Sequence, residues 1–82
     1  MKISGTLVIV GGEAFLNPDA GQPIAKETLM MMKDLPPGGT PTDRVNAAPA
    51  YFQGLGKNTG DAITVEATVE PLGAQQVLVV VQ

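Results

Sequence analysis

Acid–base chemistry in this chain would fall to its carboxylates, because the 82 residues include no histidine and no cysteine. Histidine is the commonest general base, and histidine and cysteine supply most transition-metal sites. Glu66 and Glu70 share one face of a predicted strand, with Thr68 between them. Four residues of strand rise separate the two carboxylates by roughly 13 Å. We therefore expect them on a solvated sheet face and not as a catalytic pair.

Two glycine-containing segments have the composition of phosphate-binding loops but not the spacing. Residues 54–59 read Gly-Leu-Gly-Lys-Asn-Thr, but Tyr51 stands where such a loop needs its first glycine, and a strand follows in place of a helix. Gly11-Gly12 lacks the third glycine of a dinucleotide-binding turn. Both segments are interpreted as turns. No acidic spacing resembles a calcium loop, so we expect no enzyme activity, no cofactor and no metal.

The charge of the chain bounds its partners. Its formal net charge is −3, and its basic residues are scattered: Lys2, Lys26, Lys33, Arg44 and Lys57. Phosphate backbones are bound by clustered lysines and arginines, so this pattern argues against nucleic acid. No run approaches the ~20 apolar residues that span a bilayer, so we expect no membrane partner. The default location is cytoplasmic, or the virion if the protein comes from a phage.

The pattern of apolar residues predicts one mainly β domain over residues 1–82. Ten glycines and seven prolines indicate many turns, and the 44% apolar content indicates a core of aliphatic residues. Alternation predicts strands over 2–10 and 63–70, and a turn at 71–75 leads to an antiparallel strand over 76–82. Residues 13–23 are expected to form a loop. The predicted architecture is a small antiparallel barrel or sandwich of about five strands.

The middle of the chain leaves an alternative open. Pro23 followed by good helix formers favours one short helix over 24–35, whereas residues 28–32 equally fit a buried strand. Residues 36–49 are rich in proline, glycine and threonine and predict a long surface loop, a candidate interaction arm. Tyr51-Phe52 is expected in a short strand.

The C-terminal segment is uninterrupted by any turn residue or charge. A strand of this kind must lie inside a sheet or pair with another chain. We expect it to be a strand-edge interface of a homo-oligomer, formed through Val77, Leu78, Val79, Val80 and Val81. The methionine run 30–32 offers an adaptable surface. Further expected partner contacts are Met30, Met31, Thr40, Arg44, Tyr51, Phe52 and Lys57.

One segment resembles a known family. Gly21-Gln22-Pro23-Ile24-Ala25 through Asp34-Leu35, preceded by a strand and a turn-rich loop, resembles part of the small single-stranded-DNA-binding proteins of filamentous phages. The resemblance covers residues 21–35 and requires a gap. It implies a compact β-barrel that coats DNA with basic and aromatic side chains. In this chain that role would centre on Tyr51, Phe52, Lys57 and Arg44, but most such groups are missing.

These observations favour a non-enzymatic structural or interaction protein. In this interpretation a self-associating small β-domain assembles into, or docks on, a larger complex, and its protein partner is itself or that assembly. The composition resembles capsid-decorating or tail-associated phage proteins in general character. Two alternatives stay open. The first is a single-stranded-DNA-binding protein of the filamentous-phage type. The second is an acidic inhibitor of another protein, with Glu66, Glu70 and Asp61 mimicking negative charge.

Overall fold

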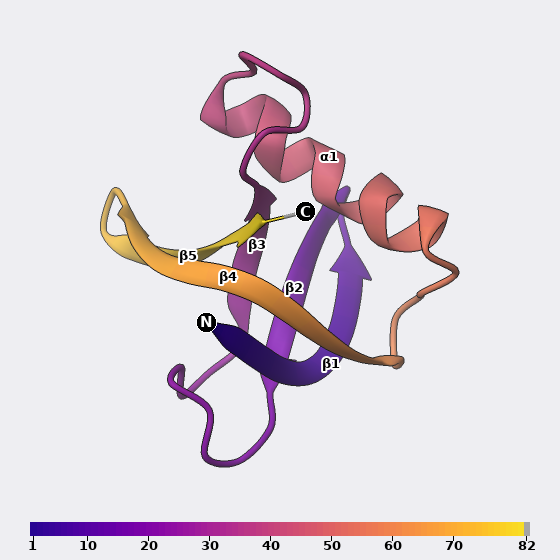
Figure 1. Cartoon of the computed structure of the whole chain (residues 1–82), viewed down its shortest axis with the longest axis vertical. Helices are drawn as coiled ribbons and strands as arrows, with labels where there is room; N and C mark the ends of the chain where they lie inside the picture. Colours follow the sequence, from indigo (N-terminus) through magenta and orange to yellow (C-terminus); the bar gives the residue numbers. More distant parts are fainter. Residues whose placement is uncertain (82) are drawn as a thin grey trace.

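The computed structural model describes residues 1–81, which form five strands and one helix joined by turns and loops. The strands are β1 (Lys2–Val10), β2 (Glu13–Pro18), β3 (Thr28–Met32), β4 (Ala62–Leu72) and β5 (Gln75–Val81), and α1 (Pro41–Gly54) lies between β3 and β4. The strand order β1-β2-β3-β5-β4 returns to β1, so the sheet closes on itself (Figure 1). The predicted mainly β fold of five strands is confirmed. Gln82, the end of the predicted last strand, lies outside the described residues.

The sheet is mixed, which corrects the expectation of a purely antiparallel one. β3 and β5 run parallel from Leu29↔Val77 to Met32↔Val80, and all other neighbouring strands are antiparallel. A parallel pair needs a long crossover between its strands. Here α1 and β4 together provide that crossover, and the closed sheet depends on it.

The first hairpin joins β1 to β2 through Gly11 and Gly12. Their φ angles of 60° and 77° lie in the left-handed region, which two-residue hairpin turns require and glycine adopts freely. The turn interpretation of this pair is confirmed. Residues 13–18, expected in a loop, instead form β2 and pair with β1 from Val10↔Glu13 to Gly5↔Pro18. Hydrogen bonding to β1 outweighs the local preference of Asn17 and Pro18 for turns.

Residues 28–32 form a strand, so the helix over 24–35 was the wrong alternative. β3 pairs with β2 on one edge and β5 on the other, and both of its faces are covered. Met30 and Met32 belong to the core inside the sheet, whereas Met31 packs on the opposite face against Val77 and Val79. A strand buried on both faces is apolar throughout, and this removes the alternation by which strands are recognised.

Helix α1 begins inside the segment that was predicted to be a surface loop. Thr40 caps it: the Thr40 hydroxyl accepts a hydrogen bond from Asp43 N (3.2 Å), and Asp43 Oδ2 accepts one from Thr40 N (3.0 Å). Pro41 opens the first turn, where proline is well tolerated. Pro49 lies inside the helix, a position that usually disfavours helix. Tyr51 also lies in α1, so the short strand expected there is wrong.

Replacing Thr40 with alanine removes the side-chain oxygen that satisfies Asp43 N. We expect the free energy of unfolding to fall by about 0.5–2 kcal/mol, as for other threonine caps. Urea denaturation followed by circular dichroism measures this change. Thr42→Ala is the matched control, because Thr42 is exposed in the same turn and is not the cap. Equal effects of the two substitutions would contradict the assignment of Thr40 as the cap.

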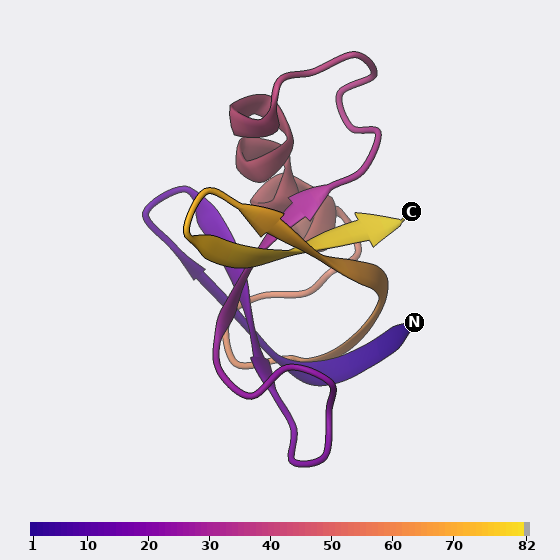
Figure 2. The same cartoon turned by 90° about the vertical axis from the view of Figure 1, so that its left-hand side faces the viewer.

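The main core fills the inside of the closed sheet, and α1 covers one end of it (Figure 2). Ala48 and Phe52 of α1 are buried in this core. Its largest fully buried side chains from the strands are Ile3, Leu7, Leu16, Met30, Met32, Leu78 and Val80. A smaller cluster of Met31, Val45, Val77 and Val79 lies between α1 and the outer face of β3 and β5. Both faces of β5 are therefore buried.

The C-terminal strand lies inside the sheet of its own chain. β5 pairs with β3 on one side and β4 on the other, and residues 77–80 are all buried. Val81 is 38% exposed. The strand-edge interface expected at Val77–Val81 is thus corrected, because both backbone edges of residues 77–80 are already paired. Of the two alternatives for this strand, the interior one is found.

The loop after α1 covers the edge of β1 that β4 leaves free. Leu7 N donates to Asp61 O (2.9 Å), and Gly60 N donates to Leu7 O (2.8 Å). The Thr59 hydroxyl accepts from Ile9 N (2.9 Å) and donates to Ile9 O (3.2 Å). The loop that superficially resembled a phosphate loop therefore protects a sheet edge.

Candidate functional site

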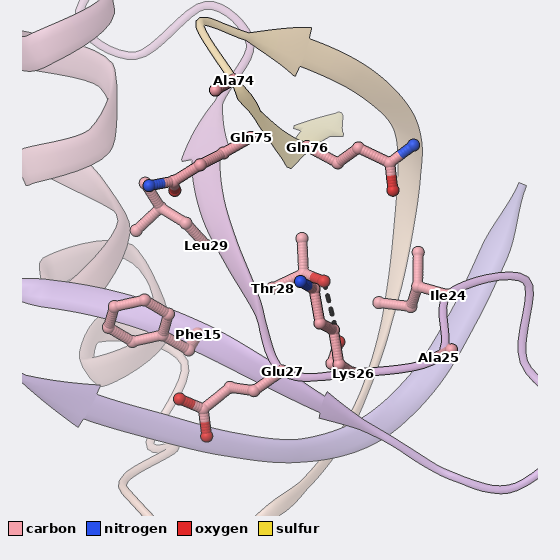
Figure 3. Close-up of a pocket in the computed structure, with 10 residues that line it drawn as sticks. All are labelled: Phe15, Ile24, Ala25, Lys26, Glu27, Thr28, Leu29, Ala74, Gln75 and Gln76. Atoms are coloured by element: carbon pink, nitrogen blue, oxygen red, sulfur yellow. Dashed lines mark hydrogen bonds between the residues drawn. The ribbon is translucent and has the colours of Figure 1, made fainter.

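A depression with a volume of about 620 Å³ lies where β3 and β5 begin (Figure 3). It is lined by residues of β2, of β3 and the segment before it, and of the turn from β4 to β5: Phe15, Ile24, Ala25, Lys26, Glu27, Thr28, Leu29, Ala74, Gln75 and Gln76. Its volume is within the range of ligand-binding pockets.

The depression exists because two neighbouring chain segments stop pairing. The parallel ladder of β3 and β5 starts at Leu29↔Val77, so residues 26–28 and 74–76 face the opening without pairing with each other. On their other side, Gln75 and Gln76 pair with Leu72 and Pro71 of β4. The result is a solvent-accessible gap between the segment that leads into β3 and the turn that leads into β5.

Five of the ten lining residues are apolar, and the lining has no net charge. Phe15 and Leu29 are paired neighbours on β2 and β3, and both are partly exposed. Gln75 lies near them in Figure 3, whereas Gln76 lies on the side of Ile24. The charges of Lys26 and Glu27 cancel. The Thr28 hydroxyl donates to Lys26 O (2.8 Å) and orders the segment before β3. This surface suits an uncharged ligand that makes apolar contacts and hydrogen bonds with amides.

The residues expected to contact a partner do not form one surface. Met30 and Phe52 are buried in the main core, so neither can contact a partner; this corrects both predictions. Tyr51 packs edge-to-face on Phe52, with ring centroids 5.2 Å apart. Lys57 is exposed in the loop after α1. Of the other expected contacts, Thr40 caps α1, and Met31 and Arg44 line a separate depression.

Sequence reasoning missed the residues of this depression. Phe15 lies in the segment 13–23 that was expected to form a loop, since β2 was not predicted. Gln75 and Gln76 were assigned to the turn and the start of the last strand. The signal in the sequence was the run Ala14-Phe15-Leu16, three consecutive apolar residues in a segment otherwise rich in turn formers.

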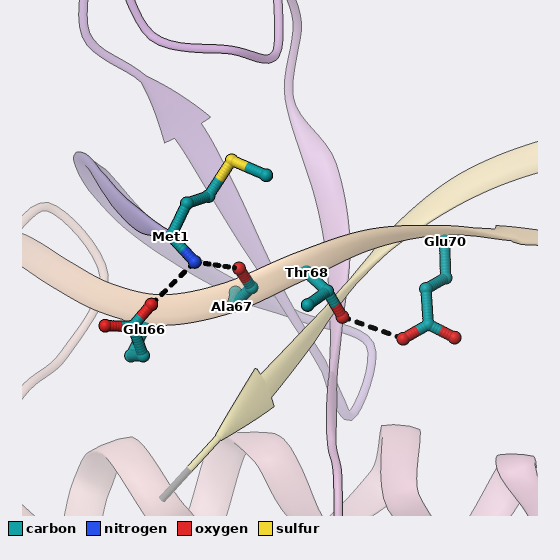
Figure 4. A network of polar contacts seen from close by, with 5 residues as sticks. All are labelled: Met1, Glu66, Ala67, Thr68 and Glu70. Atoms are coloured by element: carbon teal, nitrogen blue, oxygen red, sulfur yellow. Dashed lines mark hydrogen bonds and ion pairs between the residues drawn. The ribbon is translucent and has the colours of Figure 1, made fainter.

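The carboxylates of β4 have separate local partners (Figure 4). Glu66 pairs with the Met1 ammonium at 2.6 Å, and the hydrogen bond and charge of that ammonium hold the Glu66 pKa below its usual value. Glu70 Oε2 accepts a hydrogen bond from the Thr68 hydroxyl at 2.7 Å. The pKa of Asp43 is lowered by hydrogen bonds from Thr40. Among residues 1–81, no group of three or more acidic side chains is placed to hold a metal ion.

Comparison with known proteins adds no assignment. No family model, no curated protein and no solved structure matches this chain. In the part of the chain that the structure describes, no helix is long and apolar enough to cross a membrane. A functional hypothesis must therefore come from the depressions and their chemistry.

Proposed function

We propose that this protein is a non-enzymatic interaction domain whose partner is a protein, and that an extended segment of the partner binds between residues 26–28 and 74–76. The observation that carries the proposal is this depression, which combines apolar side chains with two glutamine amides, one threonine, one lysine and one glutamate. Interfaces bury aromatic anchors at their centre and exclude charge from it. Phe15 is the aromatic side chain available for that role.

An extended occupant fits the way in which the depression is formed. Two chain segments border the opening, and the ladder between β3 and β5 begins only beyond it. A peptide lying between such segments can exchange backbone hydrogen bonds with them, and side-chain pockets then supply specificity. The Gln75 and Gln76 amides can each donate and accept a hydrogen bond at this opening.

Replacing Phe15 with alanine tests the proposal. Peptides selected from a random library on the immobilised protein should shift the backbone NMR signals of residues 24–29 and 74–76. Phe15→Ala should weaken their binding about tenfold or more, as expected for a central aromatic anchor. Leu55→Ala is the control, because Leu55 is 60% exposed and lies outside the depression. Selected peptides that shift other regions, or bind Phe15→Ala unchanged, would refute the proposed site.

Single-stranded nucleic acid is a second candidate, and the position of the depression favours it. Among small five-stranded barrels, the OB-fold binds oligonucleotides and oligosaccharides on its second and third strands and on the loop between its fourth and fifth strands. Phe15, Leu29 and Ala74 occupy the corresponding strands and turn here. This is an analogy of fold, which does not itself imply function. Lys26 is the only basic residue of the lining, which weighs against a phosphate ligand.

Salt dependence separates the two candidates. An oligothymidine bound in this depression would lose affinity steeply as salt rises, because bound phosphates release counterions. A peptide bound through apolar contacts and amides would keep most of its affinity. Measuring both ligands at low and high salt therefore distinguishes them.

Self-association and docking on a larger assembly, including a virion, stay proposals. Because residues 77–80 of β5 are paired on both edges within their own sheet, an oligomer would have to use other surfaces than the backbone of these residues. The native mass, measured by light scattering, tests for it. The acidic-inhibitor alternative has less support, because Glu66 is already paired with the Met1 ammonium.

A further inference from the structure

A second depression, of about 280 Å³, lies on the outer face of β3, β5 and the end of β4, beside the first turn of α1. Met31, Val77 and Val79 contribute apolar side chains to it, and each is less than a tenth exposed. Lys33, Arg44 and Glu70 are its charged residues. It shares no lining residue with the larger depression, so the two can be tested independently.

Arg44 has an unused hydrogen-bond donor in this region. Its Nε atom is buried and has no hydrogen-bond partner among the described residues. Burying a donor without an acceptor is unfavourable, and more so on a charged group. Within residues 1–81 the ion pair that forms joins the Met1 ammonium to Glu66, so Lys33 and Arg44 have no carboxylate partner there. Lys33 is exposed to an anion from outside, whereas Arg44 Nε is covered by protein and reaches an anion only if its side chain turns.

We propose that this depression binds a carboxylate carried on a short aliphatic group. The Arg44 guanidinium turns into the depression and takes the carboxylate with two parallel N–H donors, a geometry that arginine favours. The Lys33 ammonium adds a second positive charge. The aliphatic part lies over Met31, Val77 and Val79, where it removes apolar surface from water.

Charge and size define the ligand class. Lys33 and Arg44 carry two positive charges and Glu70 one negative charge, which leaves one net positive charge at the depression. A singly charged carboxylate neutralises this charge, whereas a phosphate, with about −1.5 to −2, would leave an excess of negative charge beside Glu70. The volume is just below that of most drug-sized pockets and suits a small branched acid.

Titration with 4-methylpentanoate and its uncharged amide, followed by NMR of the labelled protein, tests the proposal. The acid should give saturating shifts at Met31, Arg44, Val77 and Val79, and the amide should give none at the same concentrations. Identical shifts from acid and amide, shifts elsewhere, or no saturation up to about 20 mM would overturn it.

Two charge-removing variants assign the site to its cations. Arg44→Gln should weaken binding of the acid at least about tenfold. Arg44→Lys keeps the positive charge but loses the two parallel N–H donors, so its affinity for the acid should lie between those of the wild type and Arg44→Gln. Lys57→Gln is the control, because Lys57 is exposed and outside this depression. Lys33→Gln changes an exposed residue, so it tests the site even if Arg44→Gln fails to fold. Unchanged affinity in Lys33→Gln and in folded Arg44→Gln would contradict the proposal.

A peptide arm identifies the source of the carboxylate. An acetylated tripeptide ending in leucine acid is compared with its C-terminal amide. Tighter binding of the peptide acid than of 4-methylpentanoate points to a polypeptide C-terminus, and binding of the free acid alone points to a small aliphatic acid. Both results support the site, whereas binding by neither acid overturns it.

Discussion

Replacing Gly5 with alanine is expected to lower the free energy of unfolding by about 3 kcal/mol or more, because the new methyl group would overlap backbone. A Cβ at Gly5 would overlap the Asn17 carbonyl oxygen and lie 2.9 Å from the Pro18 Cα. Gly5 pairs with Pro18 of β2 on one side and with Ile63 of β4 on the other. Both neighbours are fixed in the closed sheet, so the clash is relieved only by separating strands.

Such a loss is a large part of the free energy of unfolding of a small domain, which is typically about 5–15 kcal/mol. Urea denaturation measures it, and Gly54→Ala is the matched control. Gly54 ends α1, its φ is not positive, and a Cβ there meets no atom within 4 Å. We expect the control to be neutral or to stabilise by up to about 1 kcal/mol, since alanine favours helix. Gly5→Ala with the stability of the control would refute the close approach of β1 to β2.

Replacing Leu78 with alanine should destabilise the protein by about 2–5 kcal/mol, the range for leucines in well-packed cores. Leu78 is 0% exposed and lies in the middle of β5. It pairs with Met30 of β3 and Val69 of β4, so its side chain sits between two neighbouring strands. The cavity left by the smaller residue cannot close without moving both strands.

Val81→Ala provides the comparison within the same strand. Val81 is 38% exposed and pairs with Glu66 at the end of the ladder, so we expect a change of about 0.5 kcal/mol. Thermal and urea unfolding of both variants measure the difference. A Leu78→Ala variant as stable as Val81→Ala would mean that β5 is not central, and would restore an exposed C-terminal strand as a candidate interface.

Features of the fold that depend on local pattern could be predicted from the sequence alone. Residues 63–69 alternate between apolar and polar types, and β4 forms there because one of its faces is buried and the other solvated. The paired glycines at 11 and 12 end β1, since few residues adopt their positive φ angles. The absence of histidine and cysteine also bounds the chemistry without any structure.

Other features depend on residues that are distant in the chain, and these features were found only in the tertiary structure. Residues 28–32 are apolar on both faces, so their pattern fits helix and strand alike, and pairing with β2 and β5 selects the strand. Pro49 argued against a helix in the segment that forms α1, although Thr40-Pro41-Thr42-Asp43 carries the signature of a helix N-cap. The depression that Phe15 lines is not encoded locally at all. It exists because residues 26–28 and 74–76 become neighbours only when the sheet closes, and their backbones do not pair there.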